Sequence, residues 1–123
     1  SDSYINDNEG YLFARSITGA LDELYERKSV SKARLARQSG MSEVYLHQVF
    51  SGRRNPSRDR LLCLCIGLEA TLEETQRLLK LSAYAQLYPR SRRDAIIAYG
   101  ILHHMELHAI NDKLFAENER TLC

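Results

Sequence analysis

The residues of this 123-residue chain with the greatest capacity for recognition chemistry lie between Ser42 and Arg54. Leu46, Val49 and Phe50 fall at i, i+3 and i+4, a spacing that predicts a short helix with one buried face. The other side chains of that helix are expected to point mostly outward: Glu43, Val44, Tyr45, His47 and Gln48. Two short helices joined by a tight turn, the second with an exposed polar face, are how proteins present a helix to the DNA major groove.

Local signals define the two helices and the turn between them. Ser31 and Ser42 are the predicted N-caps, because a serine hydroxyl accepts from the free backbone N–H groups at a helix start. Gly40 stands at the turn, where glycine takes left-handed dihedrals without steric cost. Gly52 ends the second helix and Asn55-Pro56 prevents its resumption. The sequence therefore predicts one helix from Ser31 to near Gly40 and another from Glu43 to Ser51.

The segment from about Leu21 to Leu79 resembles the helix-turn-helix of the phage repressor/Cro-like family, also called xenobiotic-response-element-type regulators. The resemblance rests on Ser31-x-x-x-Leu35-Ala36, Gly40-Met41-Ser42, the Leu46/Val49 spacing, Gly52-Arg53-Arg54-Asn55-Pro56, and Leu61-Leu62 with Leu68. It implies an all-α fold with a lambda-repressor-like five-helix helix-turn-helix domain. Since fold alone does not fix function, the roles below remain hypotheses.

The resemblance implies that base contacts come from the start of the second helix and from one turn later. The candidates are Glu43, Val44, Tyr45, His47 and Gln48. A glutamine amide such as Gln48 can pair bidentately with adenine N6 and N7, and Val44 can pack on a thymine methyl. Glu43 departs from the neutral amide that is frequent in the family. Its carboxylate either accepts from a cytosine N4 donor or supports the helix cap.

The same resemblance implies phosphate contacts from Lys32, Ser42, Arg53, Arg54 and Arg58. The charge distribution agrees with this. The segment 27–60 holds nine Lys or Arg against two acids, a net charge of +7, whereas the rest of the chain sums to −6. A basic segment on an otherwise acidic chain is the electrostatic footprint expected of a duplex-DNA binder.

The remaining elements are predicted as helices, since glycine and proline are scarce and few runs alternate with period two. Residues 1–8 are predicted as a flexible N-terminus, and residues 9–84 as the helix-turn-helix domain. Its first helix runs from about Glu9 to Lys28, with a core stripe of Phe13, Ile17, Leu21 and Leu24. Ser57 and Thr71 are predicted to cap the fourth and fifth helices.

Residues 85–123 are predicted to add a C-terminal two-helix extension, with helices at about Arg92–His103 and Leu107–Glu119. The first of these is apolar nearly all round, so burial on more than one side is expected. No internal repeat is visible. The extension either packs on its own subunit or serves for dimerisation or partner docking.

Other classes of site find little support. Cys63 and Cys65 lie two apart on one predicted helix and point about 200° away from each other, and His104 and His108 lack a third ligand, so no metal site is expected. No nucleophile elbow or phosphate-binding glycine loop indicates catalysis, and we predict neither enzyme activity nor a cofactor. The chain has no bilayer-spanning apolar run, and a cytoplasmic location is expected.

Two functions stay open at this stage. The first is a sequence-specific DNA-binding transcription regulator of bacterial or phage type that binds double-stranded DNA as a homodimer, because one recognition helix covers few base pairs. The second is a protein-interaction module that retains the repressor-like fold, with a protein partner on the last two helices and only weak DNA binding.

Overall fold

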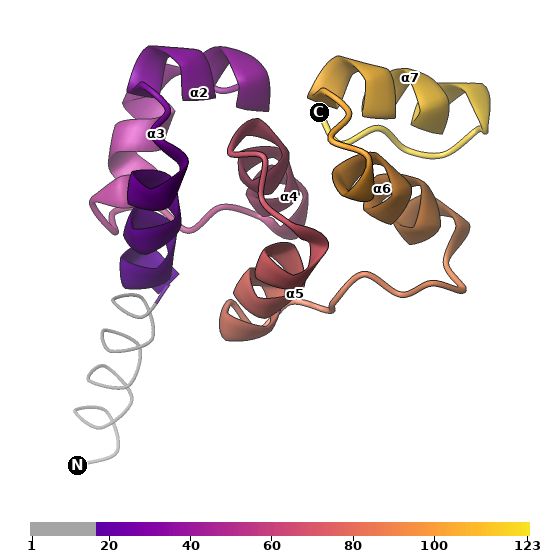
Figure 1. Cartoon of the computed structure of the whole chain (residues 1–123), viewed down its shortest axis with the longest axis horizontal. Helices are drawn as coiled ribbons and strands as arrows, with labels where there is room; N and C mark the ends of the chain where they lie inside the picture. Colours follow the sequence, from indigo (N-terminus) through magenta and orange to yellow (C-terminus); the bar gives the residue numbers. More distant parts are fainter. Residues whose placement is uncertain (1–16) are drawn as a thin grey trace.

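The computed structural model describes residues 17–123, and in this part of the chain all regular structure is helical (Figure 1). Residues 17–28 are helical, and they are followed by α2 (Lys32–Ser39), α3 (Glu43–Phe50), α4 (Arg58–Gly67), α5 (Leu72–Leu81), α6 (Arg92–Leu102) and α7 (Leu107–Ala116). The predicted all-α class is confirmed. The expectations for residues 1–8, for the helix start at Glu9 and for Phe13 lie outside the described residues.

The predicted caps are present. The hydroxyls of Ser31, Ser42 and Ser57 each accept from the backbone N–H three residues later, at 3.0–3.3 Å. Thr71 forms a reciprocal capping box with Glu74. These contacts join residues three positions apart, so the local sequence decides where the helices begin.

The last helix ends earlier than predicted. It was expected to reach Glu119, but α7 ends at Ala116. Asn118 takes a left-handed conformation with φ of 60°, and the Glu119 N–H turns back to the Leu114 carbonyl at 2.8 Å. Such a left-handed residue closes a helix by satisfying its last carbonyls.

Helix α4 is the centre of the core, and every side chain from Leu61 to Ile66 is buried. It packs against α2, α5 and α7, and Figure 1 shows it between α2 and the pair α6–α7. The predicted apolar stripe of the first helix is confirmed where it is described, because Ile17, Leu21 and Leu24 are all buried.

The structure contains an internal repeat, contrary to the expectation from the sequence. The first copy, α4–α5 with its tail, spans residues 58–88, and the second copy, α6–α7 with its tail, spans residues 93–123. Left-handed residues recur 35 positions apart between the copies, at Glu69 and His104 and again at Ala83 and Asn118. The chain thus turns at the same places in both copies.

The hydrogen bonds that fold each tail back also recur at the same offset. The side-chain oxygen of Gln76 accepts from the Leu87 N–H at 2.8 Å, and that of Asn111 accepts from the Leu122 N–H at 2.8 Å. Gln against Asn is a conservative difference, and six of the 31 aligned positions hold the same residue: Arg58/Arg93, Asp59/Asp94, Ile66/Ile101, Leu72/Leu107, Leu79/Leu114 and Leu87/Leu122. The repeat is therefore carried by a small set of shared residues and by the contacts that they make.

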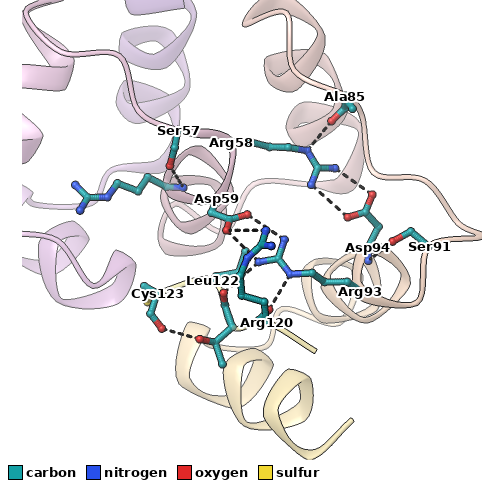
Figure 2. Close-up of polar contacts among 12 residues, drawn as sticks. Ser57, Arg58, Asp59, Ala85, Ser91, Arg93, Asp94, Arg120, Leu122 and Cys123 are labelled. Carbon is teal, nitrogen blue, oxygen red and sulfur yellow. Dashed lines mark hydrogen bonds and ion pairs between the residues drawn. The ribbon is translucent and has the colours of Figure 1, made fainter. Parts of the chain in front are cut away.

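Two arginines at equivalent positions complete the repeat (Figure 2). Arg58 donates to the carbonyls of Ala85 and Gln86, and Arg93 donates to those of Arg120 and Thr121, again 35 positions on. Each arginine also reaches the aspartate of the other copy: the first pairs with Asp94 and the second with Asp59.

The contacts between the helices of the two copies are also reciprocal. In the repeat, α6 is the counterpart of α4 and α7 is the counterpart of α5. Helix α4 packs on α7, and in the same way α6 packs on α5. Reciprocal contacts of this kind mean that the two copies are related by an approximate two-fold axis.

Helix α6 is buried on one side only, which corrects the expectation of burial on several sides. Ile97, Gly100 and Ile101 face the core, while Tyr99 and Leu102 are 60% and 59% exposed. The apolar pattern marks every face that could pack, but it does not say whether a neighbouring element exists to cover it.

Candidate nucleic-acid interface

Helix α3 carries its predicted polar face into solvent. Its buried side is made by Leu46, Val49 and Phe50, as predicted. Glu43, Val44 and His47 are exposed, with Val44 at 69%, while Tyr45 and Gln48 are half-buried. The left-handed turn at Gly40 and the Ser42 cap orient this helix against α2.

The loop that follows α3 folds back on its last turn. The backbone N–H groups of Arg53 and Arg54 both donate to the carbonyl of Gln48, at 2.9 and 3.2 Å. The side chain of Arg54 also contacts Gln48, and its Nε donates to Gln48 Oε1 at 3.0 Å. Two residues to which the sequence assigned separate roles are thus joined in one hydrogen-bonded pair.

Two more cations lie against α3. The Lys32 ammonium stands over the rings of Phe50 and Tyr25, at 3.8 and 4.8 Å from their centroids. The Arg60 guanidinium lies 4.5 Å from the ring centroid of Tyr45. Cation–π contacts of this kind hold a long basic side chain against an aromatic face. Lys32, Arg54 and Arg60 therefore flank the helix together.

Arg58, predicted as a phosphate contact, has its guanidinium engaged elsewhere. It is bound to Asp94 at 3.0 Å and to two backbone carbonyls of its own tail, so it faces the C-terminal hairpin (Figure 2). Arg60, which the sequence did not select, lies beside α3 instead. Residues two apart on a helix point about 200° away from each other, so the sequence implies that only one of these two arginines faces α3, but it does not say which one.

The basic surface is smaller than the net charge of +7 suggests. Arg27 and Lys28 pair with Glu74 at 2.9 and 3.0 Å, and Arg58 pairs with Asp94. Within residues 17–123, the cations of the segment that form no ion pair are Lys32, Arg34, Arg37, Arg53, Arg54 and Arg60. All six belong to α2, to the loop after α3 or to the start of α4.

Glu74 holds the first helix to α5 through those pairs. Burial alone would raise the pKa of its carboxyl group, but the Thr71 N–H, Lys28 and Arg27 favour the charged form, and the pKa is lowered below its ordinary value. This carboxylate is therefore ionised at neutral pH and neutralises two cations of the basic segment.

A separate cleft of about 450 Å³ lies between α2, the end of α4 and the α6–α7 corner. Its walls carry charges of both signs, Arg34 and Arg37 with Glu69, over an apolar floor that includes Ile66 and Ile101. Among residues 17–123, no three His, Cys, Asp or Glu side chains are grouped so that they could hold a metal ion. In the same range no helix has the length and apolar character needed to cross a membrane.

Comparison with known protein families adds one finding. A family model described as a helix-turn-helix domain matches residues 19–78, from the first helix into α5. No curated protein and no solved structure gives a significant match. The second hairpin, α6–α7, lies outside the matched residues.

Proposed function

From the premise that residues 19–78 form a helix-turn-helix domain, we propose that this protein is a sequence-specific DNA-binding transcription regulator that reads the major groove with α3. The observation that carries the proposal is the exposed face of α3 with three cations beside it, Lys32, Arg54 and Arg60. Phosphate attraction supplies affinity and register, while side chains on the helix face supply sequence preference.

In this proposal Gln48 reads adenine and Arg54 is a positioning residue. The carbonyl oxygen of the amide has two lone pairs, so the bond from Arg54 Nε leaves one for the adenine N6 donor. The same bond fixes which end of the amide is the acceptor, and Nε2 is left to donate to adenine N7. Val44, 69% exposed, contacts a thymine methyl.

Glu43, Tyr45 and His47 complete the proposed base-contacting surface. Phosphate contacts are assigned to Lys32, Ser42, Arg53 and Arg60. Arg60 replaces Arg58, whose guanidinium is bound to Asp94. The contacts from Lys32, Arg53 and Arg60 each release about one counterion when they form, so affinity should fall steeply with salt, whereas the neutral Ser42 hydroxyl adds no such term.

A dimer is part of the proposal, because one recognition helix contacts too few base pairs for useful specificity. A two-fold dimer would read an inverted repeat whose half-sites are separated by one helical turn, about 10–11 base pairs, or by a multiple of it.

The experiment that tests the proposal is selection from a randomised duplex library at physiological salt, with sequencing of the bound pool. An enriched inverted repeat supports a sequence-specific dimer, and an enriched single half-site supports reading by a monomer. A pool with no enrichment contradicts the proposed function.

A protein-interaction module is the second candidate. Glu43 favours it, because an exposed carboxylate in the first turn of α3 is repelled by phosphates. This candidate predicts only non-specific DNA binding, with a dissociation constant of about 10⁻⁴–10⁻⁶ M at physiological salt. The library selection separates the two functions.

A further inference from the structure

The cleft beside α2 lies where the helix-turn-helix meets the second hairpin. Helix α2 supplies part of its lining, Glu69 and Ala70 after α4 supply another part, and the α6–α7 corner from His104 to His108 supplies the rest together with neighbouring residues. Figure 1 shows α2 and α7 along the same edge of the molecule, with the last described residues between them. The cleft therefore exists only because the two parts of the chain are packed together.

Both corners of the internal repeat border this cleft. Glu69 and His104 hold the same place in the two copies, and both line it. Gly40, at the turn between α2 and α3, is also close, since an added Cβ there would stand 3.4 Å from Leu107 Cδ2 and 3.5 Å from Cys123 Sγ. The turn that orients α3 thus lies beside the second hairpin at the cleft.

The floor of the cleft is apolar. Ile66, Ile101 and Leu107 line it, and each of these side chains is at most 7% exposed. Met105 adds a half-buried thioether. A volume of about 450 Å³ falls within the range of small-molecule sites, which combine apolar surface with a few polar groups. The cleft thus has the size and the floor of a ligand site.

The charged groups around this floor are of both signs. Arg34 and Arg37 are three positions apart on one face of α2, and neither forms an ion pair within residues 17–123. Glu69 forms none in the same range, whereas the Glu106 carboxylate accepts from His108 Nε2 at 2.7 Å. The cleft therefore offers two guanidinium groups and one carboxylate to a ligand.

We infer that this cleft binds a small zwitterion with an apolar body, which is the chemistry of an apolar amino acid or of a dipeptide with apolar side chains. The ligand carboxylate pairs with Arg34 and Arg37, because a guanidinium group matches a carboxylate with two parallel hydrogen bonds. The ligand ammonium pairs with Glu69, and the apolar body covers Ile66 and Ile101. A simple anion would be repelled by Glu69, and a purely apolar molecule would cover three charges without pairing them.

Isothermal titration calorimetry of the full chain with leucyl-leucine, and in parallel with L-leucine, tests the inference. We expect at least one of these probes to bind saturably with a dissociation constant below about 1 mM. The N-acetyl form of the tighter probe lacks the ammonium, and its C-terminal amide lacks the carboxylate. Each should bind at least about fivefold more weakly. Binding of neither probe overturns the inference, and so does an N-acetyl form that binds as tightly as its parent.

Variants of the charged groups assign each end of the ligand. Arg34→Gln/Arg37→Gln should bind the tighter probe at least about tenfold more weakly and no longer distinguish it from its amide. Glu69→Gln should no longer distinguish the probe from its N-acetyl form. Arg77→Gln/Arg90→Gln, at two exposed arginines outside the cleft, is the matched control and should bind like the wild type. If circular dichroism shows that Arg34→Gln/Arg37→Gln is folded and its affinity is unchanged, the inference is wrong.

Alkylation of Cys123 gives a second readout in the native protein. This exposed cysteine lines the cleft, so a bound probe should slow its reaction with iodoacetamide. If a saturating probe left the alkylation rate unchanged, the molecule would be bound elsewhere and the assignment of the cleft would be overturned.

The inference goes beyond the proposed function and does not depend on it, because Arg34 and Arg37 are not among the proposed phosphate contacts. A chain that binds a probe in the cleft but enriches no DNA sequence supports the inference and contradicts the proposed function. A chain that enriches a DNA sequence but binds neither probe does the reverse.

Discussion

Arg93 on α6 and Asp59 on α4 form a two-bond ion pair, with both terminal guanidinium nitrogens 3.1 Å from the two carboxylate oxygens. Arg58 and Asp94 form the equivalent pair with the charges exchanged between the helices. Each arginine is also hydrogen-bonded to the tail of its own hairpin. The four residues thus fix the second hairpin on the helix-turn-helix domain, and they account for Arg58, a charge of that domain that would otherwise be assigned to DNA.

We expect Arg93→Gln to destabilise the fold by about 2 kcal/mol, a value between those typical of exposed and of fully buried pairs. The Arg93 side chain is only 11% exposed and Asp59 is 24% exposed, so the aspartate would lose its two-bond partner away from bulk water and keep only the 75% exposed Arg120 at 3.6 Å. Urea unfolding measures the change. Arg92→Gln, at a 67% exposed residue that pairs with Glu117, is the control and should cost less than about 1 kcal/mol. Equal losses for the two variants would show that the reciprocal pairs are not the stabilising element.

Gln48→Ala should relax base preference at one position of the selected sequence, by about 1–3 kcal/mol between the preferred base pair and the others. Arg54→Ala should reduce the same preference, because the guanidinium fixes the amide of Gln48. Fluorescence anisotropy with duplexes that differ only at that base pair measures both effects. If Arg54→Ala weakened all duplexes equally and kept the preference, its role would be limited to phosphate contact.

Lys32→Ala, Arg53→Ala and Arg60→Ala should each weaken binding to every duplex and lower the slope of log K against log salt by about one. Arg58→Gln is the informative control, since its guanidinium is bound to Asp94. It should leave the slope unchanged in the folded protein while lowering the urea midpoint. If Arg58→Gln lowered the slope of log K against log salt, Arg58 would contact a phosphate after all.

Stability should fall as the pH is lowered through the pKa of Glu74. The pKa of this group is lowered in the folded chain relative to its ordinary value of 4.5. Its contribution is therefore complete above about pH 4.5 and is lost as the pH falls through the folded-state pKa, because the unfolded chain binds the proton first. Glu74→Gln should remove this part of the acid dependence, as measured by urea unfolding at pH 7 and near pH 3. Glu73→Gln, at an exposed residue of the same turn, should keep it.

Thiol labelling should distinguish Cys123 from the two core cysteines. Burial raises the pKa of both Cys63 and Cys65 to about 12, whereas Cys123 is exposed. Because the thiolate is the reactive form, we expect one labelled thiol in the native protein at pH 8 and three in denaturant. Mass spectrometry after alkylation counts them. Rapid native labelling of Cys63 would contradict the packing of α4.

Much of the candidate site could be predicted from the sequence because its determinants are local. Ser42 caps α3 through a bond to a residue three positions on, and Gly40 provides the left-handed turn before it. The 3.6-residue period identified Leu46 and Val49 as the buried side of α3 and left Val44 outside. Caps, turns and helical periodicity need no knowledge of the distant chain.

Only the tertiary structure decided how the charges and apolar faces are used. The sequence could not separate Arg58, bound to Asp94 across 36 positions, from Arg60, which lies against Tyr45. The internal repeat was not evident from the sequence, because its few shared residues are spread over 31 positions and only their matching contacts align the two copies. The exposed state of Tyr99 is likewise a property of the fold. A side chain's type states what it can bind, but its partner is set by which distant segments the fold brings within a few ångströms.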